Sequence, residues 1–89
     1  MYSITYKVHD DILKERAYQI EKWGGPEHDD HHVLPDWLNF IYRCMYRLDT
    51  VNPIPLKYQR KNMLEIAALA IAALESFDRI YPPESFNND

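Results

Sequence analysis

Residues 64–74 read LEIAALAIAAL, a stretch that is apolar on nearly every side of a helix. No glycine or proline interrupts the surrounding sequence, so we predict one long helix over residues 55–81, about 39 Å in length at about 1.5 Å per residue. Its alanines allow neighbouring helices to approach closely. We expect this helix to be the centre of the fold, and Pro82-Pro83 to end it.

A first helix is predicted over residues 11–23, where the apolar residues fall on one helical face. Asp10 or Asp11 is placed to cap its start. The run Gly24-Gly25-Pro26 is placed to stop it.

A second helix is predicted over residues 35–50, with Pro35 at its first position and Asn52-Pro53 after its end. Within residues 37–48 only Asn39, Arg43 and Arg47 are polar, and they form one narrow stripe. A stripe this narrow predicts a helix that is covered on more than one side.

The two ends of the chain carry weaker signals. Apolar and polar residues alternate over residues 1–9, which is typical of a short extended arm. Residues 82–89 are polar and contain two prolines, so we expect a loose tail.

These segments predict an all-α fold in a single domain over residues 1–89, with three antiparallel helices. Two of the helices are apolar almost all round, and one further helix of about 13 residues cannot bury both. We therefore expect a homo-oligomer with helices 35–50 and 55–81 at the interface.

Composition excludes several classes of function. The net charge is -4, so a nucleic-acid partner is not expected. Cys44 is the only cysteine, which rules out an internal disulfide and fits a reducing compartment. With two glycines the chain has no phosphate-binding loop or dinucleotide fingerprint. It also lacks a secretion signal at its start and a membrane-spanning stretch, so we expect the cytoplasm and no membrane partner.

The densest polar cluster is residues 27–32, which read EHDDHH and follow the helix stop. Imidazole and carboxylate ligands suit divalent zinc, manganese or iron. A metal could bind to His28 with His32, or to Asp29 with His32, completed by a more distant side chain. The alternatives are a solvated loop without metal and a pH-sensitive loop. Candidates for the distant ligand are Glu65, Glu75, Asp78 and His9.

A second candidate site lies on helix 35–50. Arg43 and Arg47 are one turn apart and could clamp a phosphate or carboxylate between Tyr42 and Tyr46, although a solvated stripe has the same pattern. Glu65 is the one charge in the apolar stretch of the last helix. It is either a functional acid or ligand, or an ion-pair partner of Arg16, Arg43 or Arg47. The apolar face around Cys44 favours an inert thiol.

Three short motifs resemble those of small bacteriophage and prophage proteins. The chain carries Glu-Arg-x-x-Gln at residues 15–19, Glu-His-Asp-Asp-x-His at residues 27–32, and an Ala-rich helix that closes on Glu-x-x-Asp-Arg at residues 75–79. The pattern is also distantly similar to the all-α MazG-like nucleoside triphosphate pyrophosphohydrolases. In those enzymes a Glu-x-x-Glu and a Glu-x-x-Asp motif bind magnesium. Here residues 37–48 contain no carboxylate, and only Glu75 and Asp78 match the second motif.

The resemblance therefore implies the helical scaffold without a complete catalytic site. The leading hypothesis is a non-catalytic accessory protein that acts on a host protein, for example in counter-defence, or on a small anionic ligand derived from a nucleotide. Tyr42, Arg43, Tyr46, Arg47 and Glu65 are the predicted ligand-binding residues. One alternative is a metal-dependent nucleotide phosphohydrolase of MazG-like type. The other is a structural protein associated with the virion.

Overall fold

The structure is a computed structural model that describes residues 3–47 and 53–87. Every regular element in these two ranges is helical, which confirms the all-α class for this part of the chain. Its elements are α1 (Ile4–Trp23), α2 (Pro26–Asp29), α3 (Leu34–Arg47), α4 (Leu56–Ile80) and the 3-10 helix η1 (Pro83–Asn87). Within the described ranges, no helix combines the length and apolar character that crossing a membrane requires.

α1 begins at Ile4, so the predicted extended arm is wrong for residues 4–9 and the predicted helix start is about seven residues late. Residues 1 and 2 lie outside the described part. The cap is Ser3, whose hydroxyl accepts a hydrogen bond from the N–H of Tyr6, and not Asp10 or Asp11. Residues 3–47 and 53–87 contain no strand with which an extended arm could pair. Lys7 instead forms an ion pair with Asp11 one helical turn away, which stabilises the first turns of α1.

Gly24 ends α1 as expected, and its N–H donates to the carbonyl of Ile20. Its φ of +111° is a conformation that favours glycine. A Cβ atom at this position would lie 2.9 Å from the Cβ of His28. This sharp turn lets the chain fold back into α2, where a loop was expected. Pro26 is the first residue of α2, a position that proline tolerates because its missing N–H is not needed there.

The two later helices lie close to their predicted places. α4 differs from the predicted range by one residue at each end, and α3 begins one residue early. The predicted end of the second helix falls outside the described residues. Residues 83–87, which were expected to belong to a loose tail, form the 3-10 helix η1, and the N–H of Ser85 donates to the carbonyl of Pro82.

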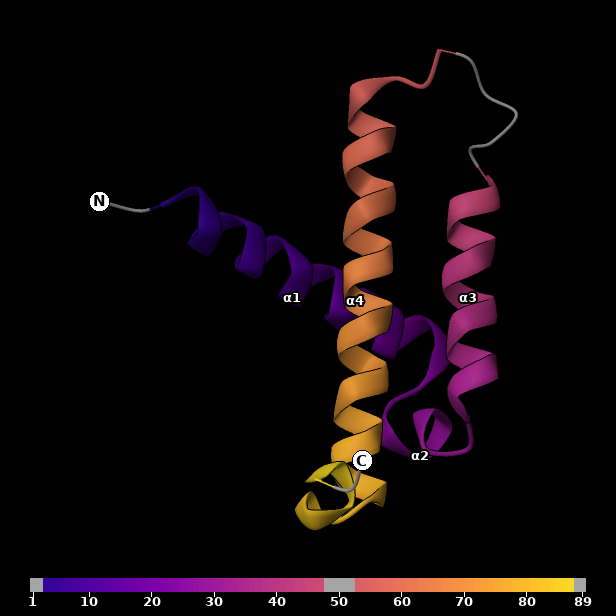
Figure 1. The fold of residues 1–89 in the computed structure, drawn as a ribbon. Helices are drawn as coiled ribbons and strands as arrows, with labels where there is room; N and C mark the ends of the chain where they lie inside the picture. Colours follow the sequence, from indigo (N-terminus) through magenta and orange to yellow (C-terminus); the bar gives the residue numbers. More distant parts are fainter. Residues whose placement is uncertain (1–2, 48–52, 88–89) are drawn as a thin grey trace.

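α3 and α4 lie side by side and run in opposite directions, while α1 crosses α4 on one side of this pair (Figure 1). The first half of α1 projects away from both helices. α1 therefore runs across the α3–α4 pair and not along it. The described residues do not form the predicted antiparallel arrangement of three helices. The crossing leaves the opposite side of the α3–α4 pair uncovered.

The apolar core is small. Trp37, Ala72 and Ala73 are buried in one cluster between α3 and α4, with three half-buried residues packed against it. The alanines permit the close helix approach expected from the sequence. A core of this size makes the polar contacts between helices a larger part of what holds the fold together.

Candidate functional site

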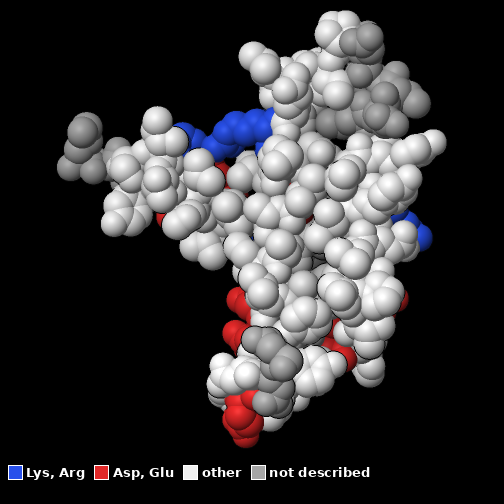
Figure 2. All heavy atoms as spheres, in the orientation of Figure 1, with Lys and Arg blue, Asp and Glu red and all other residues white. Residues whose placement is uncertain are grey.

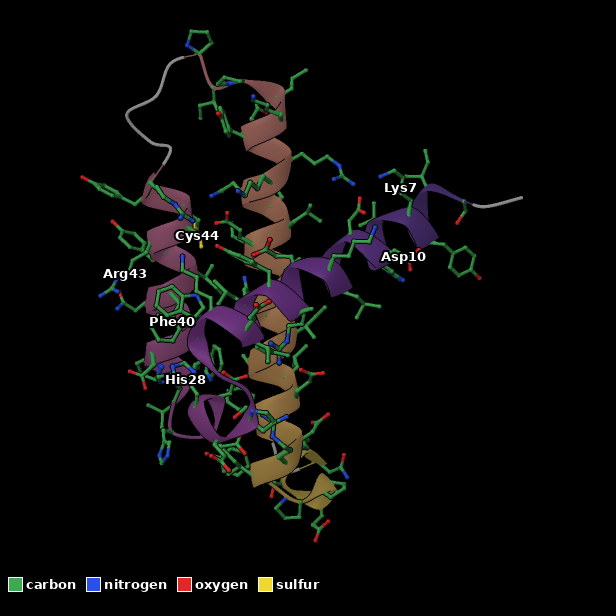
Figure 3. All side chains as sticks on the ribbon, turned by 180° about the vertical axis from the view of Figure 1, so that it is seen from behind. Lys7, Asp10, His28, Phe40, Arg43 and Cys44 are labelled. Atoms are coloured by element: carbon green, nitrogen blue, oxygen red, sulfur yellow. The ribbon has the colours of Figure 1, made fainter. Side chains whose placement is uncertain are left out.

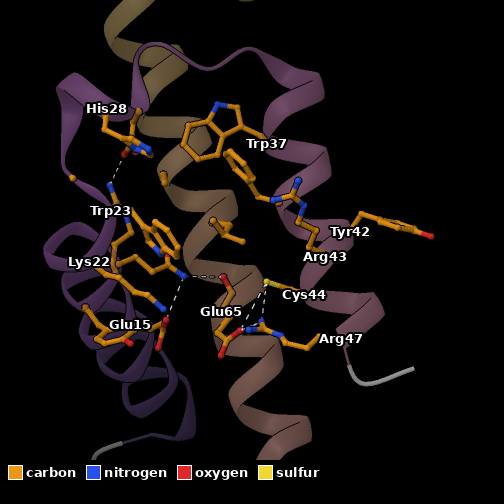
Figure 4. Close-up of a pocket in the computed structure, with 18 of the residues that line it drawn as sticks. Glu15, Lys22, Trp23, His28, Trp37, Tyr42, Arg43, Cys44, Arg47 and Glu65 are labelled. Carbon is orange, nitrogen blue, oxygen red and sulfur yellow. Dashed lines mark hydrogen bonds and ion pairs between the residues drawn. The ribbon is translucent and has the colours of Figure 1, made fainter. Parts of the chain in front are cut away.

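A cleft of about 730 Å³ opens between the second half of α1, α3 and the middle of α4. Its volume lies in the range of small-molecule sites. Aromatic side chains line it from both sides, including Trp23 of α1 and Trp37 of α3 (Figure 4). Five cationic side chains share the lining with three carboxylates: Arg16, Lys22, Arg43, Arg47 and Lys61 with Glu15, Asp29 and Glu65.

All five predicted ligand-binding residues line this cleft. Tyr42 and Tyr46 stack with ring centroids 6.0 Å apart and lie at its outer rim, where Tyr42 points away from α4 (Figure 4). Arg47 reaches across to Glu65 and forms an ion pair. One of the predicted pairings of Glu65 is therefore confirmed.

Arg43 differs from Arg47 in one respect that matters for binding. Among the described residues its guanidinium makes no ion pair or hydrogen bond. Arg43 lies one turn before Arg47, on the side of α3 that lines the cleft. A guanidinium without a carboxylate partner is available for an external anion.

Cys44 is buried beside the Arg47–Glu65 ion pair, with its Sγ atom 3.4 Å from Nη2 of Arg47. Burial is the largest cause that raises the pKa of the thiol above its ordinary value. A thiol that stays protonated at neutral pH is a poor nucleophile, in agreement with its interpretation as an inert residue.

The residues that α1 brings to the cleft were missed at the sequence level. Glu15, Gln19 and Lys22 fall on one helical face, and Gln19 donates to both Glu15 and the backbone carbonyl of Glu65. Burial, and then the charge of Glu65, raises the pKa of Glu15. The i, i+4, i+7 spacing of these polar residues was a usable signal. It became meaningful only once α1 was known to cross α4 beside Glu65.

His28 lies where α2 approaches the start of α3 (Figure 3), and the two aspartates that follow it in the EHDDHH cluster hold the helices together. Arg16 is buried and its guanidinium contacts Asp29 at 3.4 Å and Glu75 at 2.8 Å, which joins α1 to α2 and α4. Asp30 accepts hydrogen bonds from the Ser76 hydroxyl at 2.8 Å and from the Arg79 guanidinium at 2.8 Å. We call these six residues the anchor network. Asp29 thus serves Arg16, a role the sequence did not suggest.

The histidines separate into a pair and single residues. The Nε2 atoms of His28 and His32 lie 3.5 Å apart, whereas His31 and His9 are exposed. His32 also packs edge-on against Trp37 and Phe40. No group of three or more His, Cys, Asp or Glu side chains suited to a metal ion exists among the described residues. The two histidines of the predicted metal site therefore meet at their Nε2 atoms, whereas Asp29 contacts the Nδ1 atom on the other side of the His28 ring. Glu65 pairs with Arg47 and Glu75 pairs with Arg16 instead.

Replacing Asp30 by asparagine is expected to reduce stability at neutral pH and to weaken its dependence on acid pH. Hydrogen bonds from Arg79, and then from Ser76, hold the pKa of Asp30 below its ordinary value of 3.8. A lowered pKa means that the ionised group stabilises the fold above about pH 4, and that this contribution is lost as the pH falls further. Urea denaturation at pH 7, 4 and 3 should show a smaller acid-induced loss for Asp30→Asn than for the wild type.

The control is Asp78→Asn, which removes the same charge from an exposed position next to Arg79. It should keep the wild-type pH dependence. An equal acid-induced loss of stability in the wild type and Asp30→Asn would show that the contacts of Asp30 do not stabilise the fold.

No family model matches this chain. Comparisons with the curated proteins and with the solved structures likewise give no match.

Proposed function

We propose that this protein is a non-catalytic binding module that holds a small anionic ligand of the nucleotide class in the cleft. The observation that carries the proposal is Arg43, whose guanidinium has no partner among the described residues and lines a cleft that also presents several aromatic rings. A phosphate group pairs with such a guanidinium, and a base or other flat ring packs against aromatic side chains. The resemblance to small phage proteins supports an accessory role in a host cell.

Charge supports an anion over a cation. Arg16 and Arg47 neutralise the carboxylates of Asp29 and Glu65, which leaves Glu15 facing the three cations Lys22, Arg43 and Lys61. The ammonium of Lys22 lies 4.8 Å from the ring centroid of Trp23. The cleft as a whole therefore attracts negative charge, although the chain is acidic.

The arrangement of the carboxylates favours binding over hydrolysis. MazG-like catalysis would need several carboxylates free to hold magnesium. Glu75, the first residue of the retained Glu-x-x-Asp motif, accepts two hydrogen bonds from Arg16. Asp30 is engaged by Arg79 in the same way. Guanidinium groups thus occupy carboxylates that a metal-dependent enzyme would use.

Titration calorimetry with ATP, AMP, adenosine and inorganic phosphate tests this proposal. We expect saturable binding of the nucleotides, weakened about tenfold by Arg43→Ala because one charge-assisted contact is lost. The matched control is Arg60→Ala, which removes the same charge from α4 at a position outside the cleft, where Arg60 pairs with Asp11. Binding of none of these ligands, or equal weakening by both variants, would contradict the proposal.

The same samples test the enzyme alternative. Incubation of the wild type with each nucleotide and Mg²⁺ should release neither phosphate nor pyrophosphate above the rate without protein. Release that Glu75→Gln abolishes would instead establish a MazG-like hydrolase.

We also propose that the protein self-associates through the side of the α3–α4 pair that α1 leaves open. On α4, Met63 and Leu74 are more than half exposed and lie on the side opposite the buried Ala68 and Ala72, at 100° per residue. Residues of both helices repeat there at alternating spacings of three and four, which is typical of helix–helix interfaces. This apolar face consists of Leu34, Leu38, Ile41, Met45, Met63, Ala67, Ala70 and Leu74.

The surface agrees with this assignment. Viewed in the direction of Figure 1, the surface over α3 and the middle of α4 is largely uncharged, basic groups lie between α1 and the upper part of α4 and at the outer edge of α3, and acidic groups gather at the lower end of the molecule (Figure 2). Two antiparallel helices packed on two others form a four-helix bundle. A second copy of this chain is therefore the proposed partner, and the apolar face is where the two copies meet.

A further inference from the structure

We propose that His28 and His32 form a binding site for a late divalent transition metal, with Zn²⁺ as the reference ion. The site joins the end of α2 to the start of α3. This inference rests on the geometry of four side chains and does not depend on the proposed ligand in the cleft.

The Nδ1 atom of each histidine lies on the side of a carboxylate. Nδ1 of His28 lies 3.2 Å from Oδ1 of Asp29, and Nδ1 of His32 lies 3.7 Å from Oδ2 of Asp36. An ionised carboxylate accepts hydrogen bonds and cannot donate them. The contact of His28 is within hydrogen-bond distance, so its Nδ1 is placed to donate to Asp29. Asp36 lies beyond hydrogen-bond distance and sets a negative charge on the Nδ1 side of the His32 ring.

The inner nitrogens then face each other as acceptors. A neutral imidazole with its proton on Nδ1 has a lone pair on Nε2, and the two Nε2 atoms are 3.5 Å apart. With both protons on Nδ1, neither Nε2 atom can donate to the other, and a metal ion between them would bind both lone pairs. Carboxylates behind both rings are the arrangement that orients metal-binding histidines and raises their basicity.

The separation fits a tetrahedral ion. Zinc–nitrogen bonds are about 2.0–2.1 Å, so two nitrogens of a tetrahedral site are about 3.3–3.4 Å apart. The observed 3.5 Å needs almost no adjustment. The two histidines supply two protein ligands, and water or a bound ligand takes the other positions.

The surroundings hold the pair in place. Asp29 is itself fixed, because its second oxygen faces the buried guanidinium of Arg16. The His32 ring packs against Trp37 and Phe40, with centroid distances of 5.4 Å and 5.0 Å. The His28 side chain is 42% exposed, which leaves a path for an ion to enter. A site that is already oriented loses little entropy when a metal binds.

The test is calorimetry and thermal unfolding of chelator-treated protein with Zn²⁺ alone. We expect saturable binding of one ion per chain and a rise in Tm with Zn²⁺ concentration, because an ion that binds the folded state stabilises it. His28→Ala should weaken binding about tenfold or more and abolish the rise in Tm. Co²⁺ in place of Zn²⁺ should give the visible absorption of a tetrahedral ion in the wild type only.

Two further variants decide between a site and loose histidine binding. His31→Ala removes a neighbouring exposed histidine and should bind Zn²⁺ as the wild type does. Asp36→Asn keeps both ligands and removes the carboxylate behind His32, so affinity should fall about tenfold. Absence of saturable Zn²⁺ binding, or equal losses in His31→Ala and His28→Ala, would overturn the proposal. Circular dichroism of each variant shows whether the helices are retained.

Discussion

Replacing Arg16 by alanine is expected to lower the free energy of unfolding by about 3–5 kcal/mol, the usual cost of breaking a buried ion pair from one side. Arg16 is 8% exposed and Asp29 is 5% exposed. Removing the guanidinium leaves the Asp29 carboxylate buried without its cation. A small domain has about 5–15 kcal/mol of stability in total, so Arg16→Ala should be close to unfolded at 25 °C. Urea denaturation followed by circular dichroism measures the loss.

The control is Lys7→Ala, which removes a cation of α1 from the exposed Lys7–Asp11 pair. Exposed pairs of this kind contribute less than about 1 kcal/mol. Adding Asp29→Asn to Arg16→Ala should recover part of the loss, because the unpaired charge is then gone. A loss below about 1 kcal/mol in Arg16→Ala would contradict the assignment of the anchor network as the main link between α1 and α4.

Replacing Leu74 by glutamate is expected to convert the protein into a monomer. Leu74 is 61% exposed in the single chain, so a glutamate costs little there. In the proposed interface each copy would bury an unpaired carboxylate, at a cost of several kcal/mol. The dissociation constant of the oligomer should therefore rise about 100-fold or more. Light scattering coupled to size-exclusion chromatography at micromolar concentration gives the mass.

Leu13→Glu is a closely matched control. Leu13 is also 61% exposed, but it lies on α1, outside the apolar face. This variant should keep the wild-type mass. A monomeric wild type would refute self-association, and dissociation by both variants would place the interface elsewhere.

The anchor network also explains why the cleft exists. Its contacts tie α1 and α2 to the last turns of α4, while α1 crosses the middle of α4 and leaves room beside α3. The cleft lies in this space. Five of its six members are fixed positions of the three short motifs at residues 15–19, 27–32 and 75–79: Arg16, Asp29, Asp30, Glu75 and Arg79. In this protein those motif residues build the scaffold, and the ligand-binding residues proposed here lie largely between them.

Much of the helical structure was predictable because its signals are local. The segment before Pro82 contains no glycine or proline up to residue 56, and it predicted both ends of α4 to within one residue. Gly24 predicted the end of α1. The start of α1 was missed because an alternation of apolar and polar residues outweighed the capping signal of Ser3. The 3-10 helix η1 was not predicted, because polar residues and prolines carry no signal for such a short element, although they do not exclude it.

The candidate site was predictable only in part. Arg43 and Arg47 were identified from their spacing on one helix, and the pairing of Glu65 from its isolation in an apolar stretch. The contribution of α1 to the cleft was not, because it depends on the direction in which α1 crosses α4. No pattern within residues 15–22 encodes that direction.

The sequence by itself determined the helices, their stops and an excess of apolar surface, since these follow from neighbours within about four residues along the chain. Tertiary structure alone decided what the charged residues do. Arg16 meets Glu75 across 59 positions of sequence, and Arg79 meets Asp30 across 49. Asp29 thereby became a buried counterion, and His28 and His32 were left facing each other. The physical reason is that an ion pair or a ligand set depends on distance in space, which only the packing of the helices defines.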